Sequence, residues 1–139
     1  MEEKIEIDKP LLCSVSGGKD STAMILFLLE KGYTFQDMTL VFMNTGWEHI
    51  ETYRYLEKLE SFFGVKIIRL KAAVSVSEKH RDFVSEIEQD LGFESPFVRI
   101  AVKKSIFSNR VIKWCTSELK LYPFKKYLDT LEDEIISCV

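Results

Sequence analysis

Apolar and polar positions along the first half of the chain predict strands and helices in alternation. Three short, mainly apolar runs have the length of buried strands: residues 11–15, 39–43 and 65–70. Two segments between them carry apolar side chains at helical spacing, and each precedes a glycine: residues 20–31 before Gly32, and residues 47–63 before Gly64. Because the strand runs are too apolar for a sheet with one wet face, we expect a parallel sheet with helices on both faces.

The second half of the chain predicts further helices and one last strand. Residues 76–91 are expected to form a helix with mixed faces, and residues 92–96 a loop. Another helix is expected to follow Pro123 and to end near Leu131, and residues 134–139 are expected to form a strand. The predicted fold class is therefore α/β, a three-layer α/β/α sandwich with a mainly parallel, Rossmann-like sheet of about five strands.

Length and composition fit one globular domain, residues 1–139. Apolar residues make up 46% and charged residues 29%, and the formal net charge of −3 gives no overall sign of nucleic-acid binding. Cys13, Cys115 and Cys138 show no paired spacing, which favours reduced thiols in a cytoplasmic protein. The first ten residues differ from an export signal, and the longest apolar run, residues 23–29, is too short to cross a membrane. We therefore expect a cytoplasmic domain without a membrane partner.

The most informative stretch follows the first predicted strand and reads Ser16-Gly17-Gly18-Lys19-Asp20-Ser21; we call residues 16–21 the glycine loop. Glycines allow a tight turn and a close approach of the backbone to a ligand, and the N–H groups at a helix start face whatever lies in the turn. We predict a polyphosphate site formed by Ser14, Ser16, Gly17, Gly18, Lys19, Asp20 and Ser21. The alternative is a structural turn in which Asp20 and Ser21 only cap the helix.

The glycine loop resembles the Ser-Gly-Gly-x-Asp-Ser pyrophosphate loop (PP-loop) of the ATP pyrophosphatases, or adenine nucleotide α-hydrolases. These enzymes share a HUP-type nucleotide-binding fold with the phosphoadenylyl-sulfate reductases. The resemblance implies binding of ATP or a related adenine nucleotide, cleavage between its α- and β-phosphates, and adenylylation of an acceptor with release of pyrophosphate. Lys19 would neutralise the phosphates, and Asp20 would be the carboxylate that holds Mg²⁺, which bridges phosphate oxygens. Lys19 stands at the variable position of the motif.

A second segment, Asn44-Thr45-Gly46, follows the second predicted strand. It resembles the Asp-Thr-Gly-x-x segment of the sulfonucleotide reductase branch, with Asn44 in place of the usual Asp. Backbone groups near Met43 could meet the adenine edge, so Met43, Asn44, Thr45 and Gly46 are predicted to bind the nucleotide. The alternative for this segment is a plain turn between a strand and a helix.

A third segment, Trp114-Cys115-Thr116-x-x-Leu119-Lys120-x-x-Pro123, is similar to the Cys-Thr-x-x-Leu-Lys-x-x-Pro signature of phosphoadenylyl-sulfate-reductase-like proteins. The resemblance implies that Cys115 and Lys120 lie near the reactive end of the nucleotide, and Trp114 is predicted to contact the nucleotide. Neighbouring lysines could also lower the pKa of the Cys115 thiol, whereas a buried inert cysteine is the alternative. Relatives that reduce sulfonucleotides use a C-terminal cysteine segment or cluster-ligating cysteine pairs, and this chain has neither. We therefore expect no iron–sulfur cluster.

The sequence leaves several alternatives open. The chain is expected to be an adenylylating ATP pyrophosphatase, a sulfonucleotide reductase or sulfur-transfer protein that uses Cys115, or a nucleotide-binding module without catalysis. The family usually continues into a Gly-x-Arg-x-x-Glu segment beyond the last strand, which suggests a minimal or truncated member, or a homo-oligomer or partner subunit that completes the site. The acceptor is not identified.

A basic stretch precedes the third segment. Five basic residues and no acidic one lie between Glu94 and Glu118: Arg99, Lys103, Lys104, Arg110 and Lys113. This stretch predicts a surface for phosphates or RNA, and the alternative is a solvated helix face.

Overall fold

The computed structural model describes residues 9–131 and the backbone of residues 136–138. The chain divides into two compact units. The described parts of residues 1–42, 49–69 and 130–139 form the first unit, and residues 43–48 and 70–129 form the second. The single domain expected from the sequence stays a prediction. Among the described residues, no helix combines the length and the apolar character needed to cross a membrane.

The strands form a sheet in the order β3-β2-β1-β4. Their bounds are β1 Leu11–Ser14, β2 Met38–Asn44, β3 Ile67–Lys71 and β4 Ile136–Cys138. Strand β1 pairs in parallel with β2 on one side and with β4 on the other, with Leu11 opposite both Met38 and Ile136. The described residues thus contain four strands, and the prediction of about five was wrong. The segments between β3 and β4 that could have supplied another strand are helical.

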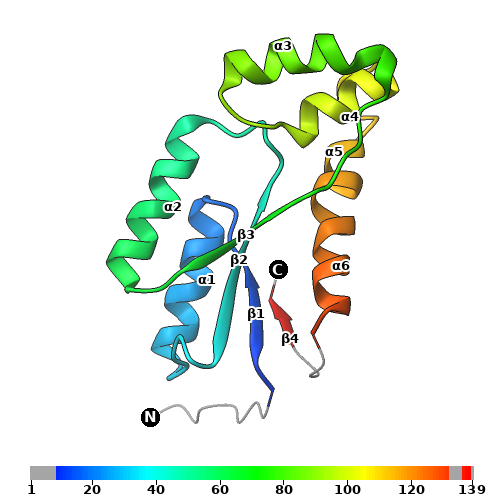
Figure 1. Ribbon diagram of the computed structural model, residues 1–139. Coiled ribbons are helices and arrows are strands. Elements are labelled where there is room, and N and C mark those ends of the chain that lie inside the picture. Colours follow the sequence, from blue (N-terminus) through cyan, green and yellow to red (C-terminus); the bar gives the residue numbers. More distant parts are fainter. Residues whose placement is uncertain (1–8, 132–135, 139) are drawn as a thin grey trace. The chain divides into compact units, whose positions relative to one another are not determined.

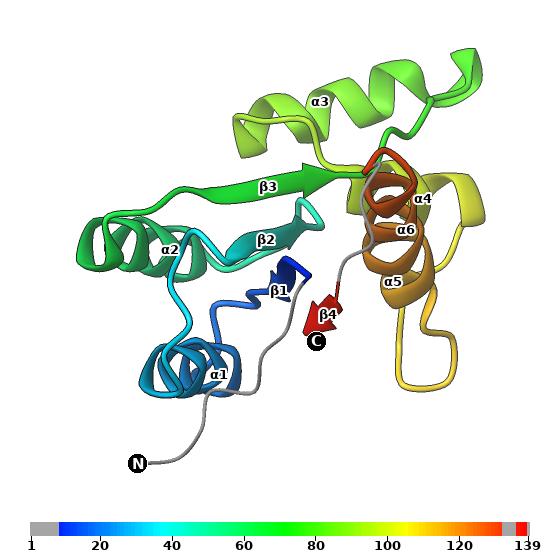
Figure 2. The ribbon, with the colours of Figure 1, turned by 90° about the horizontal axis from the view of Figure 1, so that it is seen from below.

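Two helices of the first unit lie side by side on one face of the sheet, as Figures 1 and 2 show. Helix α1 spans Lys19–Glu30 and helix α2 spans Ile50–Phe63. Helix α2 begins three residues later than predicted because the His49 ring accepts a hydrogen bond from the Glu51 amide at 3.2 Å and caps the helix there. It ends, as predicted, at Gly64, whose φ of +67° is the left-handed conformation that favours glycine at this position.

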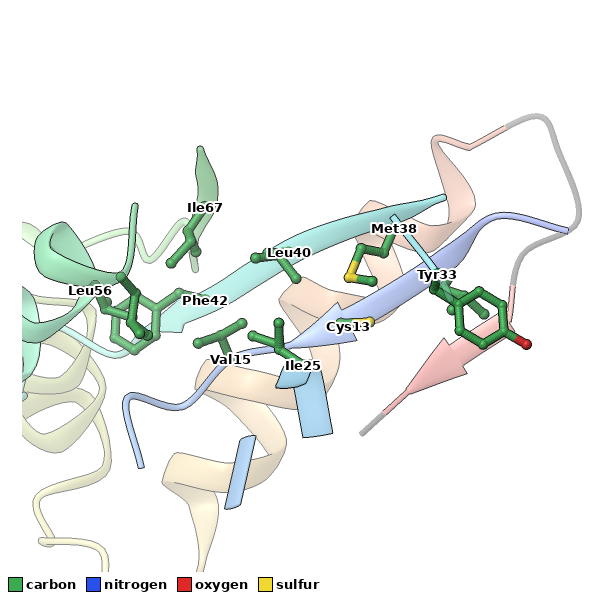
Figure 3. Packing of buried hydrophobic residues seen from close by; sticks show 11 residues of the cluster. Cys13, Val15, Ile25, Tyr33, Met38, Leu40, Phe42, Leu56 and Ile67 are labelled. Carbon is green, nitrogen blue, oxygen red and sulfur yellow. The ribbon is translucent and has the colours of Figure 1, made fainter. Parts of the chain in front are cut away.

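Alternate residues of β1 and β2 form the core between the sheet and these helices (Figure 3). The buried side chains on this face belong to Leu11, Cys13, Val15, Met38, Leu40 and Phe42, and they pack against Ile25 of α1 and Leu56 of α2. The intervening residues Leu12 and Val41 are buried as well. For β1 and β2, burial on both faces confirms the inference that these strands are too apolar for a half-exposed sheet, and the mixed α/β class with a parallel sheet is confirmed. For β3 the inference was wrong, because only Ile67 is buried there and the polar side chains of Arg69 and Lys71 interrupt its apolar run. The three-layer arrangement stays a prediction.

The second unit is helical apart from the ends of β2 and β3. Its elements are η1 Glu78–His80, α3 Arg81–Leu91, α4 Pro96–Lys104, α5 Trp114–Thr116, η2 Ser117–Leu121 and α6 Tyr122–Asp129. The helix predicted over residues 76–91 begins at Glu78 with a 3-10 turn, and the predicted last helix ends at Asp129. Of the predicted strand over residues 134–139, residues 136–138 form β4 and the others lie outside the described residues.

Helix α4 was missed by the sequence analysis. The Ser95 hydroxyl caps it by accepting a hydrogen bond from the Val98 amide at 3.2 Å, and Pro96 occupies its first turn, where a missing N–H costs nothing. Phe97 and Ile100 of α4 are buried and pack with Trp114 and Leu119 in a separate apolar cluster. This cluster fixes the segment that carries the third predicted motif.

Candidate functional site

The glycine loop connects β1 to α1 in the first unit. The Val15 amide still donates to the Val41 carbonyl at 2.8 Å, so the chain leaves the sheet only after Val15. Gly17 then has a φ of +79°, and a Cβ at this position would lie 2.9 Å from Cγ2 of Thr52 on α2. Both the backbone conformation and the space therefore favour glycine here.

Hydroxyl groups hold the glycine loop closed. The Ser21 hydroxyl accepts a hydrogen bond from the Ser16 amide and donates one to the Gly18 carbonyl, each at 3.2 Å. The Ser16 hydroxyl accepts from the Gly18 amide at 3.2 Å. The Thr22 hydroxyl lies 3.0 Å from the Tyr55 hydroxyl, which links the start of α1 to α2. These contacts fix the loop without using the amides of the first turn of α1.

The start of α1 is suited to an anion. Its N-cap is Gly18, which has no side chain to accept a hydrogen bond from the first turn. The amides of Lys19, Asp20 and Ser21 therefore have no acceptor within the helix, and they lie at the positive end of its dipole. The Lys19 and Asp20 side chains are both exposed. This donor set fits a polyphosphate with a divalent cation, because Mg²⁺ is usually held by one or two carboxylates together with phosphate oxygens.

Metal binding by protein side chains alone was also considered. Among the described residues, no group of three or more His, Cys, Asp or Glu side chains is placed to hold a metal ion.

The second predicted segment forms what we call the strand-end turn (residues 44–47), at the end of β2 in the second unit. The Asn44 side-chain oxygen accepts from the Gly46 amide at 2.9 Å, and the Thr45 hydroxyl donates to Glu48 Oε1 at 2.7 Å and accepts from the Trp47 amide at 3.2 Å. Met43, Thr45 and Gly46 are buried. Most polar groups of this segment are therefore already paired within the turn.

The start of α4 takes up further groups of the strand-end turn. The Ser95 hydroxyl donates to the Gly46 carbonyl at 2.7 Å, and the Phe97 amide donates to the Thr45 carbonyl at 3.0 Å. Gly46 has a φ of +76°, and a Cβ there would lie 2.7 Å from Pro96 Cδ and 2.9 Å from Ser95 Cα. The turn is thus held against the start of α4, and sequence reasoning missed the Ser95 contact because it did not predict α4.

Trp114 and Cys115, from the third predicted segment, also lie in the second unit. Trp114 is 5% exposed, and among the described residues its indole Nε1 has no hydrogen-bond partner. Cys115 is partly buried, and the Ser108 hydroxyl donates to its Sγ at 3.0 Å. Lys120 is exposed.

Phe97 brings the second and third segments together. Its ring centroid lies 5.1 Å from that of Trp47, with the planes 16° apart, and 5.0 Å from that of Trp114. The predicted residues thus form two groups: Ser14 and the glycine loop in the first unit, and the residues of the other two segments in the second. The sequence signals for Phe97 and Ser95 were the Ser95-Pro96 pair, which is typical of a helix start, and the apolar positions that follow it.

Two residues of the basic stretch are paired with carboxylates. Arg99 donates to both carboxylate oxygens of Glu88, at 2.7 and 3.0 Å, and Lys104 lies 2.7 Å from Glu118. The hydrogen bond from Arg99 is the main cause that lowers the pKa of Glu88, followed by burial, which acts in the opposite direction. Much of the charge of these two residues is therefore neutralised, and an RNA surface stays a prediction.

Comparison with known proteins identifies the family. Residues 10–137 match the phosphoadenosine phosphosulfate reductase domain. The chain belongs to this family. The phosphoadenosine phosphosulfate reductase domain is part of the adenine nucleotide α-hydrolase-like superfamily, so the resemblance inferred from the glycine loop is confirmed.

Curated relatives are similar over most of the chain. An uncharacterized protein of Methanocaldococcus jannaschii is 31% identical over 96% of the chain, which spans 23% of that protein. An uncharacterized nin region protein of Escherichia phage lambda is 31% identical over 84% of the chain, which spans 41% of the relative. An uncharacterized 37.8 kDa protein of Escherichia phage 186 is 29% identical over 90% of the chain, which spans 42% of it. The chain thus spans less than half the length of these relatives.

Proposed function

We propose that the chain binds ATP, or a related adenine nucleotide, at the glycine loop and cleaves it between the α- and β-phosphates. An acceptor would be adenylylated and pyrophosphate released. The observation that carries the proposal is the glycine loop, in which Gly17 is left-handed and closely packed while the first-turn amides of α1 have no helical acceptor. Family membership supports an adenine nucleotide as the ligand.

In the proposed reaction, an acceptor nucleophile attacks the α-phosphorus. A new bond forms between the nucleophile and phosphorus, the bond from phosphorus to the α–β bridging oxygen breaks, and that oxygen leaves with pyrophosphate. The backbone amides of Gly17 and Lys19 would hold the β- and γ-phosphates, joined by the Gly18 amide once it gives up its hydrogen bond to the Ser16 hydroxyl. The Lys19 ammonium would offset the charge that develops on the phosphates. Catalysis would come mostly from positioning and charge stabilisation.

Mg²⁺ bound to the phosphates would add positive charge at the leaving group, and Asp20 is the carboxylate proposed to orient it. Asp20 is exposed on the first turn of α1 and follows Lys19 directly. An Asp20→Asn variant should therefore weaken nucleotide binding in Mg²⁺ more than in its absence. Equal weakening with and without Mg²⁺ would assign Asp20 to the helix start alone.

The proposed cleavage is tested by following the label of γ-labelled ATP in the presence of Mg²⁺ and candidate acceptors. Pyrophosphate as the labelled product is expected, and orthophosphate would reject cleavage between the α- and β-phosphates. Because the acceptor is not identified, exchange of labelled pyrophosphate into ATP provides a second readout. Tight nucleotide binding with neither reaction would favour a binding module without catalysis.

A second candidate function is sulfur chemistry at Cys115. The observation that favours it is the contact of Sγ with the Ser108 hydroxyl at 3.0 Å, a polar neighbour that also lies 3.0 Å from the Ile112 carbonyl. A sulfonucleotide reductase or sulfur-transfer protein would lose thiol-dependent turnover in a Cys115→Ser variant and lose part of it in Ser108→Ala. Unchanged turnover in Cys115→Ser would remove this candidate.

A further inference from the structure

An apolar cavity of about 430 Å³ lies within the second unit, between α3, α4 and the segment that follows α4. Its volume lies in the range typical of small-molecule sites. Six of the residues that line it are Trp47, Phe83, Ile87, Ala101, Ile106 and Phe107. Three of them are large aromatic side chains that remain more than half exposed: Trp47, Phe83 and Phe107. Exposed aromatic groups around one hollow are typical of a binding surface.

Trp47 gives this cavity a flat wall. Phe97 stacks on the Trp47 ring but does not line the cavity, so this contact holds the indole while 52% of Trp47 stays exposed. A rigid aromatic surface of this kind favours a flat apolar group as its partner.

A smaller cavity of about 180 Å³ adjoins the apolar one. The two share His80 and Val102 in their linings. The smaller cavity is also lined by Ser75, Ser77, Arg99 and Lys103, so two of its lining residues are positively charged and none is a carboxylate. The Ser77 hydroxyl lies 3.1 Å from Nδ1 of His80. Arg99 is paired with Glu88, whereas Lys103 is exposed in the last turn of α4. The charge and the hydroxyl groups of this cavity are complementary to an anion.

We propose that the two cavities together bind a small organic anion with a flat apolar body. The apolar body would occupy the cavity beside Trp47 and Phe107, and the anionic group would lie beside Lys103 and the Ser75 and Ser77 hydroxyls. This site involves no residue of the glycine loop. Binding of the anion goes beyond the proposed function, and only its role as the adenylyl acceptor would rest on that function.

Two fluorescent probes with the same aromatic body test the proposal on the full chain. The first is 8-anilino-1-naphthalenesulfonate, which carries an anionic group, and the second is N-phenyl-1-naphthylamine, which does not. Fluorescence titration without nucleotide should show one bound sulfonate probe per chain. Because the measurement needs no nucleotide, its outcome is independent of whether the chain cleaves ATP.

Lys103→Gln is expected to weaken binding of the sulfonate probe about fivefold at low salt, the effect of one ion pair, and to leave the uncharged probe unchanged. Lys104→Gln is the matched control, because Lys104 is the neighbouring lysine of α4 and lines neither cavity. Equal effects of the two substitutions on the sulfonate probe would overturn the proposed anion position.

Phe107→Ala is expected to weaken both probes by at least about fivefold, because apolar contact area is lost at the cavity wall. Its control is Val111→Ala, since Val111 is 90% exposed in the same segment and does not line the cavity. Phe107 is itself 67% exposed, so the variant should fold. Unchanged affinity in Phe107→Ala, or displacement of the probe by ATP in direct competition, would overturn the proposal.

Discussion

The glycine loop and the strand-end turn each contain a left-handed glycine just beyond a parallel strand, yet they differ in what surrounds it. Gly17 faces one methyl group of the Thr52 side chain, and the amides that follow it have no partner within α1. Gly46 faces the Pro96 ring and the Ser95 backbone, and its own amide and carbonyl are both hydrogen-bonded. The comparison teaches that similar sequence signals have different outcomes: the first turn leaves backbone donors without a helical acceptor, and the second pairs its backbone groups with the start of α4.

The largest effect on stability is expected at Gly46. Gly46→Ala should lower the free energy of unfolding by about 2–5 kcal/mol, because a left-handed alanine and contacts with rigid neighbours both cost energy. The control is Gly64→Ala, at a φ of +67° with no atom within 4 Å of the added Cβ. In the control variant, the free energy of unfolding measured with denaturant should fall by only about 1 kcal/mol. Equal losses would contradict the tight packing inferred for the strand-end turn.

For ligand binding, the largest effect is expected at Gly17. Gly17→Val should weaken ATP binding at least about a hundredfold, which corresponds to about 2.7 kcal/mol.

A milder Gly17→Ala should lose about 1–2 kcal/mol of stability, because the atom it meets is the end of a side chain. Thr52→Ser removes that methyl, so the double variant should regain part of the stability in denaturant unfolding. No regain would mean that Thr52 does not limit the space at Gly17.

The Glu88–Arg99 pair contributes to the surroundings of the strand-end turn. Glu88 accepts a hydrogen bond from the Ser95 amide at 2.9 Å, and Ser95 in turn contacts the strand-end turn. Glu88→Gln should lower the free energy of unfolding by about 1–2 kcal/mol, the difference between charged and neutral hydrogen bonds. Glu94→Gln is the control, since that 73% exposed carboxylate lies 3.5 Å from Arg99 and should contribute little. Equal effects in urea unfolding would contradict a supporting role for Glu88.

The same pair predicts a dependence of stability on pH. The pKa of Glu88 is lowered in the folded chain, first by the hydrogen bond from Arg99, so its contribution is present above its ordinary value of 4.5 and is lost as the pH falls through the lowered value. The pKa of Glu60 in the first unit is lowered in the same way, first by the hydrogen bond from Arg69. Glu88→Gln should thus flatten, but not abolish, the acid-side loss of stability. An unchanged acid-side slope would contradict the lowered pKa.

The smallest effect is expected at the end of α4. Ser105 has a φ of +55° where α2 and α3 end in glycine at a similar φ. Ser105→Gly should raise the free energy of unfolding by about 0.5 kcal/mol, because the relief of the left-handed conformation exceeds the entropy cost of glycine. Thermal unfolding should show a small rise in midpoint, and a fall would mean that Ser105 makes a stabilising contact.

The sequence predicted the parts of the fold that depend on local periodicity. Strands β1 and β2, helices α1 and α2, and the end of α2 at Gly64 all follow from apolar spacing and glycine positions. Helix α4 was missed because the prediction ended a loop at Pro96, although proline is favoured in the first turn of a helix.

The candidate site was predictable only in part. The glycine loop could be located because its signals are contiguous in the chain. By contrast, the Ser95 contact with Gly46, the ring contacts of Phe97 and the Ser108 contact with Cys115 join residues through tertiary packing. The contact between Gly17 and Thr52 has the same origin, because it depends on how α2 packs beside α1. No local pattern reports such pairs.

The most direct test of the account is a crystal structure of the chain with Mg²⁺ and α,β-methylene-ATP, an analogue that resists the proposed cleavage. The account predicts that the β- and γ-phosphates accept hydrogen bonds from the amides of Gly17, Gly18 and Lys19, with the Gly18 amide exchanging its bond to the Ser16 hydroxyl for one to phosphate. Phosphates bound elsewhere, with those amides facing solvent or protein side chains, would contradict it.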